Sequence, residues 1–257
     1  MADFNIWEGV YESFAQAEAH VVEPNRGAWL TRLEDRTRDM VHSHRTGTLA
    51  PWGQYCLPAV LAPLYATRDR LRVLDFGGGT GTTYLEVANA LFGPDGRGNL
   101  DYIVVDAPDV CDIGRRQLGD AVRFLSSLDD VAGEFDLVHM GSVMQYLGDG
   151  WRDLLARLCA MASPFILFSD LVAGPIRSFV TLQTFYGGSQ ASRFYNLGEI
   201  EGAMSCQGFA KVMDVPYRGS YLGKASPIPM DNLPAENRLT DSRHALFMRR
   251  GGPKSAP

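Results

Sequence analysis

The sequence predicts an α/β fold: a doubly wound, mainly parallel sheet of seven strands, the last of them antiparallel, with an N-terminal helical cap. Between residues 71 and 172, short apolar runs typical of buried strands alternate with segments of helical spacing. Strand, helix and strand in series require crossover connections, which build a parallel sheet covered on both faces. With 46% apolar residues among 257, the chain can bury one core of that size.

Five strands and three helices are expected in that region. The strands cover 71–76, 101–106, 121–125, 135–140 and 164–170, and the helices cover 82–92, 108–118 and 151–162. The stretch between the third and fourth strands is so short that its helix is at most a turn. A helix over 196–209 follows, with Asn196 as its cap and Glu199 at the third helical position, and then strands over 210–217 and 243–250.

The two ends of the chain differ from this middle region. Residues 1–68 contain no strand-like run, and apolar residues recur at helical spacing, as in 29–41, so we expect a helical cap or lid. Residues 69–250 form the sheet domain. Within it, 218–242 is rich in Gly, Pro, Asn and Ser and is expected to be a long loop, and 251–257 a disordered tail.

Composition excludes several classes of protein. A net charge of −6 argues against a general nucleic-acid binder, which usually has a basic face. The four cysteines are far apart with no C-x-x-C pair, so we expect reduced thiols and no metal site. The N-terminus lacks the pattern of a secretory signal, and no apolar run approaches the length of a membrane span. The expected location is the cytoplasm, with no membrane partner.

A glycine-rich turn follows the first predicted strand, in the stretch "VLDFGGGTG". Ligands of an open parallel sheet bind beyond the carboxyl ends of its strands, and this turn lies at that edge. Glycines allow a tight turn and a close approach of the backbone to a ligand, which explains Gly77, Gly78, Gly79 and Gly81.

The spacing of these glycines narrows the choice of ligand. Thr82 stands where the dinucleotide fingerprint needs its third glycine, and no Gly-Lys-Ser/Thr follows as in a P-loop. Asp75, just before the turn, is a poor neighbour for a pyrophosphate and suits a cationic ligand. Asp106 ends the next strand, where a carboxylate can accept hydrogen bonds from both hydroxyls of a ribose. Together these features fit S-adenosylmethionine, whereas either acid alone could be a strand-end cap or a surface charge.

With these motifs the chain resembles the class I S-adenosylmethionine-dependent methyltransferases, which have a Rossmann-like fold. The resemblance is good over residues 71–172 and weak over 173–250. Within the superfamily the chain is similar to a bacterial group of methyltransferases of poorly defined substrate. The stretches "VVDAPDVCDIGRRQL", "GSVMQYL", "QTFYGGS" and "RFYN" carry this closer likeness.

The resemblance implies a set of cofactor-binding residues. Those around the methionine and ribose portion would be Asp75, Gly77, Gly78, Gly79, Thr80 and Gly81, with Asp106 on the ribose diol. Ala107, Pro108, Ser126, Ser127 and Leu128 would border the adenine, and Met140, Gly141 and Ser142 would lie beneath the sulfonium. The acid that commonly follows the third strand is displaced here to Asp129 or Asp130, which leaves its role in doubt.

Candidates for the chemistry lie on two segments. Gln145 and Tyr146 follow the fourth strand and can face a substrate, although Tyr146 could equally be a packed aromatic. The stretch "TLQTFYGGSQASRFYN", read as a loop, supplies Tyr186 as a third catalytic candidate. Its other members and the N-terminal region supply the expected substrate pocket, which comprises Tyr11, Tyr55, Phe185, Arg193 and Tyr195, with Trp7 and Trp52 as further lid residues.

Two other polar residues lie near the cofactor motifs. His139, inside the fourth strand, is interpreted as a satisfied core histidine rather than a base. Asp170 ends the fifth strand, where a pocket acid and an ordinary strand-end acid are equally plausible.

Three functions stay open at this point. The leading one is methyl transfer to O or N of a small molecule, in specialised metabolism or sugar modification. The second is a cyclase or lyase that consumes S-adenosylmethionine, releasing methylthioadenosine and a cyclic amino acid. The third is a non-catalytic cofactor-binding partner subunit. The helical N-terminal region could pair two chains in a homodimer, but nothing in the sequence requires it.

Overall fold

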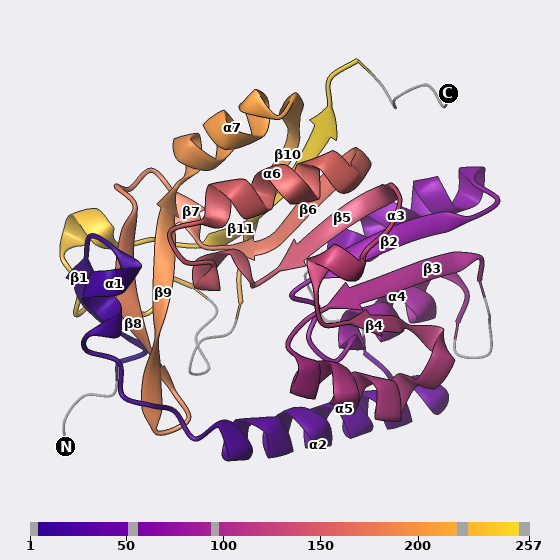
Figure 1. Cartoon of the computed structure of the whole chain (residues 1–257), viewed down its shortest axis with the longest axis horizontal. Coiled ribbons are helices and arrows are strands. Elements are labelled where there is room, and N and C mark those ends of the chain that lie inside the picture. The colour runs from indigo at the N-terminus through magenta and orange to yellow at the C-terminus, as the bar shows by residue number, and fades with distance from the viewer. Residues whose placement is uncertain (1–4, 51–55, 94–97, 220–225, 252–257) are drawn as a thin grey trace.

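The computed structural model describes residues 5–50, 56–93, 98–219 and 226–251. They form a large and a small sheet flanked by helices (Figure 1). The large sheet contains β2 (Leu71–Phe76), β3 (Leu100–Val105), β4 (Arg123–Leu125), β5 (Phe135–Gly141), β6 (Ala162–Leu171), β10 (Phe209–Tyr217) and β11 (Ser242–Arg249). The small sheet contains β1 (Trp7–Tyr11), β7 (Ala173–Gly174), β8 (Phe179–Phe185) and β9 (Gly188–Asn196).

Seven α-helices are described. They are α1 (Phe14–Glu18), α2 (Arg26–Arg45), α3 (Cys56–Thr67), α4 (Thr82–Leu91), α5 (Pro108–Leu118), α6 (Trp151–Met161) and α7 (Leu197–Cys206). Short 3₁₀ turns cover Gly119–Ala121, Leu128–Asp130, Met144–Tyr146 and Ala235–Asn237. The turn at Leu128–Asp130 stands where the sequence left room for only a turn.

The order of strands in the large sheet is β10-β11-β6-β5-β2-β3-β4. Strands β2 to β6 are parallel to one another, and β11 is antiparallel to both β6 and β10. This confirms the predicted fold, a mainly parallel seven-stranded Rossmann-like sheet with an antiparallel last strand. The strand order reverses between β2 and β5, which opens a crevice at the carboxyl ends of these strands.

Each face of the large sheet has its own apolar core. On one face Leu74, Val138 and Phe168 pack with Trp151 of α6 and Ile200 of α7. On the other, Val73, Leu137 and Leu167 pack with residues of α3, α4 and α5, among them Leu57, Leu61, Val87 and Cys111. Successive strand residues point to opposite faces, so the alternation read from the sequence places both cores.

Local sequence signals explain the helix ends near the crevice. Helix α5 begins at Pro108, has Asp109 in its first turn and Arg115 and Arg116 in its last, which complements its dipole. Helix α7 is capped by Asn196, whose side chain accepts from the N–H of Glu199 at 3.3 Å, as predicted.

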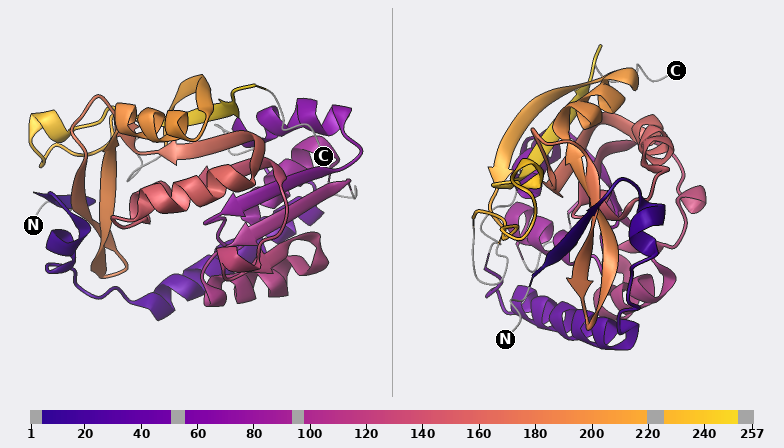
Figure 2. Two further views of the ribbon diagram at one scale, coloured as in Figure 1. Left: turned by 45° about the horizontal axis from the view of Figure 1, so that its top comes forward. Right: turned by 90° about the vertical axis from the view of Figure 1, so that its left-hand side faces the viewer.

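The small sheet corrects two expectations. The N-terminal region is not wholly helical, because residues 7–11 form β1, which pairs antiparallel with β8. The stretch 181–196, read as a loop, belongs to a hairpin of β8 and β9. The small sheet stands across one end of the large sheet, and its hairpin reaches down towards the start of α2 (Figure 2).

The division of the chain at residue 68 stays a prediction. Helices α2 and α3 pack against α4, so the N-terminal residues share the core of the large sheet. Trp52 and Tyr55 lie outside the described residues, as does the predicted tail apart from Gly251. No helix in the described part is long and apolar enough to cross a membrane.

Candidate active site

The glycine turn is held by hydrogen bonds from its own backbone. The N–H of Gly77 donates to the Val105 carbonyl at 2.8 Å, and the N–H of Gly79 donates to Asp106 Oδ2 at 2.8 Å. Gly77, Gly79 and Gly81 all have positive φ, at 70°, 59° and 78°. The turn after β2 is therefore tied to the end of β3.

Two of these glycines are required by space. A Cβ on Gly77 would lie 2.3 Å from Val143 Cγ2, and one on Gly78 would lie 2.6 Å from the Asp75 carboxylate. Neither neighbour is the free end of a long side chain, so a side chain at either position would move the turn. The turn is thus wedged between the segment after β5 and the end of β2.

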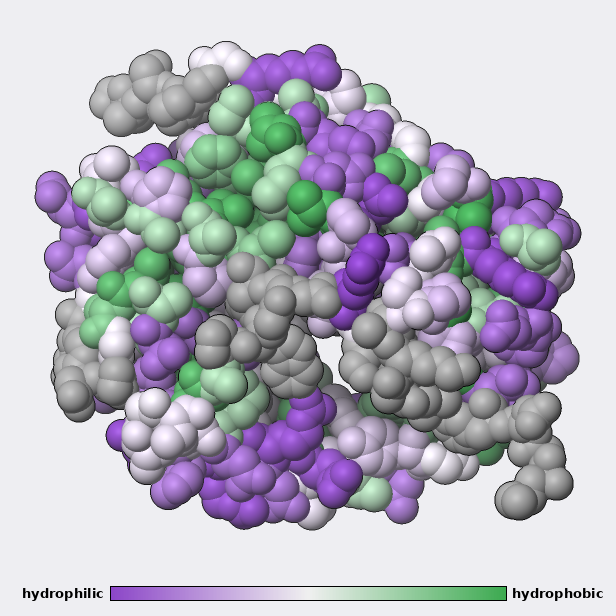
Figure 3. Space-filling model, turned by 180° about the vertical axis from the view of Figure 1, so that it is seen from behind, coloured by the Kyte–Doolittle hydropathy of each residue, from purple (hydrophilic) through white to green (hydrophobic). Residues whose placement is uncertain are grey.

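A cavity of about 860 Å³ opens beside this turn. Its size lies within the range of small-molecule and cofactor sites. Seen from behind, the molecule has an opening above the mostly hydrophilic edge where α2 lies (Figure 3). The predicted cofactor residues that line the cavity are Gly77, Gly79, Asp106, Ala107, Ser126, Ser127, Leu128 and Ser142.

Asp106 has the geometry expected of an acceptor for a ribose. Each carboxylate oxygen accepts one backbone N–H, Oδ1 from Ala107 at 2.7 Å and Oδ2 from Gly79 at 2.8 Å. Each oxygen therefore keeps acceptor capacity towards the cavity. Burial raises the pKa of Asp106, although these two N–H groups lower it in part.

The other expected cofactor residues lie elsewhere. Gly78, Gly81 and Pro108 are not among the residues that line the cavity. Thr80 is buried and its hydroxyl bonds that of Thr37 at 2.6 Å. Met140 points into the core on the side of α6, because strand alternation turns it away from the crevice, and Gly141 lines a smaller cavity instead.

Asp75 differs most from its expected place. It is 1% exposed and does not line the large cavity. Its side chain projects from β2 to the face covered by α3 and α4, where Oδ2 accepts from the Tyr102 hydroxyl and Oδ1 lies 2.7 Å from His139 Nδ1. The acid before the glycines therefore packs against the turn and contacts a histidine.

The roof of the large cavity comes from α2 and the hairpin, and Phe185 is the one roof residue among the expected site residues. Helix α2 contributes Trp29, Leu33 and Arg36, and the hairpin contributes Phe185 and Gln190. Trp29 and Phe185 meet with ring centroids 5.8 Å apart. The apolar face of 29–41 was visible in the sequence, but its position over the glycine turn depends on tertiary packing.

Helix α2 is fastened to the sheet domain at three points. Thr37 bonds Thr80, Arg26 forms a two-pronged ion pair with Asp109, and Arg116 pairs with Glu34 at 2.9 Å. The Thr37 bond is buried and the two ion pairs are exposed, so the threonine contact contributes most to the docking.

The expected catalytic residues occupy three different environments. Tyr146 lines the large cavity, is 39% exposed and donates to Gln183 Oε1 at 2.8 Å. Desolvation of its hydroxyl raises its pKa, so it stays protonated at neutral pH. Gln145 is buried and lines neither cavity, and its Oε1 has no partner in the described part of the chain. Tyr186 lies in the hairpin turn with φ 43°, and its carbonyl accepts from the N–H of Asn25.

Of the expected substrate-pocket residues that the structure describes, only Phe185 lines the large cavity. Tyr195 is fully buried, donates to the Met144 carbonyl at 2.8 Å and packs edge-on against Trp151, so it is a core residue. Arg193 pairs with Asp149 beside the Phe14 ring. Tyr11 stacks on His20 and borders a separate pocket, because β1 carries it to the outer end of the small sheet.

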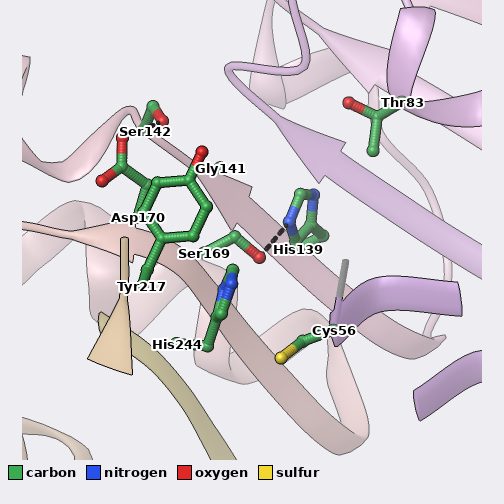
Figure 4. A pocket seen from close by; sticks show the side chains of 9 residues that line it. All are labelled: Cys56, Thr83, His139, Gly141, Ser142, Ser169, Asp170, Tyr217 and His244. Carbon is green, nitrogen blue, oxygen red and sulfur yellow. Dashed lines mark hydrogen bonds between the residues drawn. The ribbon is translucent and has the colours of Figure 1, made fainter. Parts of the chain in front are cut away.

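A second, smaller cavity of about 140 Å³ adjoins the first. Ser142 borders both. The small cavity is lined by Cys56, Thr83, His139, Gly141, Ser142, Ser169, Asp170, Tyr217 and His244 (Figure 4). His139 and Asp170 thus both reach a cavity. His139 is 3% exposed with both ring nitrogens hydrogen-bonded, as expected of a satisfied core histidine. In the described residues no group of three or more His, Cys, Asp or Glu is arranged to hold a metal.

The chain is similar to proteins of one class. A family model described as a methyltransferase domain matches residues 41–212, more than half of the chain. A search of curated proteins by sequence finds no match.

Solved structures share the fold at low identity. One is 1,6-didemethyltoxoflavin-N1-methyltransferase of Burkholderia thailandensis, with 17% identity, a TM-score of 0.47 and coverage of 89% of this chain and 91% of that one. Another is mitomycin 7-O-methyltransferase MmcR, with 15% identity, a TM-score of 0.45 and coverage of 75% and 53%. A third is LepI in complex with SAM, with 12% identity, a TM-score of 0.51 and coverage of 77% and 48%. The chain therefore spans about half the length of MmcR and LepI.

The match of the family model agrees with the glycine turn, the acid after β3 and the strand order. The chain belongs to the methyltransferase domain family and is an S-adenosylmethionine-dependent transferase of the class I superfamily.

Proposed function

We propose that the protein methylates O or N of a small-molecule acceptor in specialised metabolism, with S-adenosylmethionine in the large cavity. The observation that carries this proposal is the Gly79–Asp106 hydrogen bond at the edge of an 860 Å³ cavity. It leaves both carboxylate oxygens able to accept from a ribose diol. The negative net charge and the volume of the cavity favour a small acceptor over a nucleic acid.

The lining residues fit the parts of this cofactor. Asp106 would hold the ribose, and Ala107, Ser126, Ser127 and Leu128 would border the adenine. Arg36 reaches the cavity from α2, and no ion pair of its guanidinium occurs within the described residues. It would pair with the α-carboxylate of the methionine portion, which is the only carboxylate of the ligand.

The bound cofactor supplies an activated methyl group on a sulfonium. The protein then has three tasks: to hold the acceptor in line, to exclude water and to accept a proton. Trp29 and Phe185 cover the cavity from two different elements and would exclude water. Tyr146 would position the acceptor by hydrogen bonding, since its raised pKa leaves almost no phenolate to act as a base at neutral pH.

The test is incubation of the purified protein with S-adenosylmethionine, first alone and then with small-molecule extracts, followed by mass spectrometry. Formation of S-adenosylhomocysteine that depends on an extract, together with a product heavier by one methylene unit, is the expected result. Methylthioadenosine formed without any acceptor would instead indicate the cyclase or lyase reaction. Failure to bind either form of the cofactor in calorimetry would contradict the proposal.

A further inference from the structure

Three side chains from three adjacent strands are joined by hydrogen bonds at the small cavity. Asp75 of β2 lies opposite His139 of β5 in the parallel ladder, and Ser169 comes from β6. His139 Nδ1 is 2.7 Å from Asp75 Oδ1, and His139 Nε2 is 2.9 Å from Ser169 Oγ. Figure 4 shows the histidine and serine side chains meeting at the wall of the cavity.

The partners of Asp75 fix the direction of these hydrogen bonds. The Tyr102 hydroxyl donates to Oδ2 at 2.7 Å, and Oδ1 accepts from the Nδ1–H of His139. A neutral imidazole with its proton on Nδ1 has a bare Nε2, which accepts from the Ser169 hydroxyl. The side chains of Asp75 and His139 are 1% and 4% exposed, so water does not compete for these bonds.

A glycine makes room for this arrangement. Gly141 lies opposite Ser169 in the ladder between β5 and β6. A Cβ at Gly141 would stand 2.9 Å from His139 Cε1. The imidazole therefore lies over Gly141 and extends to the neighbouring strand, where it meets Ser169.

The three hydrogen-bonded residues lie next to the cofactor cavity. Ser142 lines both cavities, and its N–H donates to the Ser169 carbonyl at 2.9 Å. The hydroxyl of Ser142 donates to Asp170 Oδ2 at 2.7 Å, so the junction between the two cavities is polar and ordered.

We propose that Ser169 is the catalytic proton acceptor of the transfer, with His139 and Asp75 as positioning residues, and that the small cavity takes the uncharged hydroxyl end of the acceptor. This rests on the proposed function. The acceptor O–H gives its proton to Ser169 Oγ while Ser169 gives its own proton to His139 Nε2. The acceptor oxygen forms its bond to the methyl group as the methyl–sulfur bond breaks, and that electron pair stays on sulfur. The imidazolium beside Asp75 later returns its proton to water.

The lining of the cavity favours this class of acceptor. Asp170 on the same wall disfavours an anion, and the polar Thr83 and Ser142 disfavour a purely apolar group. A volume of about 140 Å³ admits the reacting end of a molecule and leaves its body in the larger cavity.

Several titratable groups surround the imidazole of His139. Asp75 contacts it from β2, and Cys56 of α3, Asp170 of β6, Tyr217 of β10 and His244 of β11 face the same cavity. Burial raises the pKa of Cys56, and it raises that of Tyr217 to about 12, so both stay neutral at pH 7. Asp75 is thus the acidic group in direct contact with the ring.

Labelling with methanesulfonyl fluoride tests whether His139 and Asp75 activate Ser169, and it needs no methyl acceptor. Ser169 Oγ would attack the sulfur, fluoride would leave, and His139 Nε2 would take the serine proton. Mass spectrometry of peptides is expected to find the label on Ser169. In His139→Gln, which cannot take the proton, and in Asp75→Asn, which favours the other tautomer, the rate should fall about 100-fold.

Two variants complete the design. Gly141→Ala keeps every titrating group and displaces the imidazole, so it should also slow labelling if His139→Gln proves unstable. Ser205→Ala, at an exposed serine of α7, is the matched control and should leave the rate unchanged. No label on Ser169 at any pH would overturn the proposal. So would a labelling rate equal to that of the parent protein in His139→Gln, Asp75→Asn and Gly141→Ala.

Calorimetry with S-adenosylhomocysteine separates this proposal from the proposed function. The sulfonylated protein should bind this ligand as tightly as the untreated protein does. Loss of affinity on labelling would mean that the small cavity belongs to the cofactor site, and it would overturn the proposal. If the untreated protein binds no S-adenosylhomocysteine, the proposed function fails, while the labelling results still decide whether Ser169 is activated.

Discussion

The backbone N–H of Gly79 donates to Asp106 Oδ2 at 2.8 Å, which joins the turn after β2 to the end of β3. The bond places a carboxylate at the edge of the large cavity with one N–H on each of its oxygens. The shape of the glycine turn and the orientation of the acid therefore depend on each other.

Replacement of Asp106 by Ala should weaken binding of S-adenosylhomocysteine by about 10- to 100-fold. The reason is the loss of charge-assisted hydrogen bonding to the ribose, which contributes about 1.5–3 kcal/mol in total. Isothermal titration calorimetry would measure the change. Asp120→Ala, at an exposed acid near the end of α5, is the control and should bind normally. Equal affinity in the Asp106 variant would show that the cavity binds its ligand in another way.

The affinity for S-adenosylhomocysteine should also depend on pH through Asp106. Its pKa is raised, so as the pH falls the carboxyl group takes up a proton earlier than an ordinary aspartic acid does. The protonated form accepts hydrogen bonds poorly, and affinity should therefore be complete above the raised pKa and decline below it. Calorimetry over a pH series would measure this decline, and the decline should disappear in Asp106→Asn.

Gly78→Ala should destabilise the protein by about 1–3 kcal/mol, because the new methyl group would overlap the Asp75 carboxylate at 2.6 Å. Thermal and urea denaturation would measure the loss. Gly148→Ala is a matched control, since nothing lies within 4 Å of its added Cβ and its φ is not positive. If both variants unfold at the same urea concentration, the packing of Asp75 under the turn is not rigid.

Arg36→Met should weaken binding of S-adenosylhomocysteine about tenfold by removing the partner of its carboxylate. The same variant should bind methylthioadenosine, which has no carboxylate, as the parent protein does. Arg32→Met, one turn earlier on α2, keeps Arg36 and should change neither affinity. A similar loss for both ligands would place Arg36 elsewhere than beside the carboxylate.

Much of the fold was predictable because its signals are local. Helix α5 has a proline and an acid in its first turn and arginines in its last turn, which are local signals for the ends of a helix. The buried strands from β2 to β6 are short apolar runs. Strand β1 was missed because "WEGVY" is short and its partner β8 lies about 170 residues away. The hairpin was missed because its polar residues and Gly187–Gly188 are typical of loops.

The residues of the candidate site also differ in how far the sequence indicates them. Gly79 and Asp106 belong to a sequence motif, whereas the position of Arg36 at the cavity depends on how α2 packs over the sheet. The partnership of His139 and Ser169 depends on the adjacency of β5 and β6. Aspartate, histidine and serine occur in separate runs, and only the strand order brings them together.

The position of Asp75, His139 and Ser169 on hydrogen-bonded strands has a consequence for how the family can diversify. Their spacing is set by the sheet register. A shift of one residue would move the apolar side chains of a strand to the opposite face and disrupt both cores. Loops and helix ends tolerate change far more readily. Relatives with other acceptors are therefore expected to differ in the α2 roof and the hairpin while these three strand positions keep their side chains.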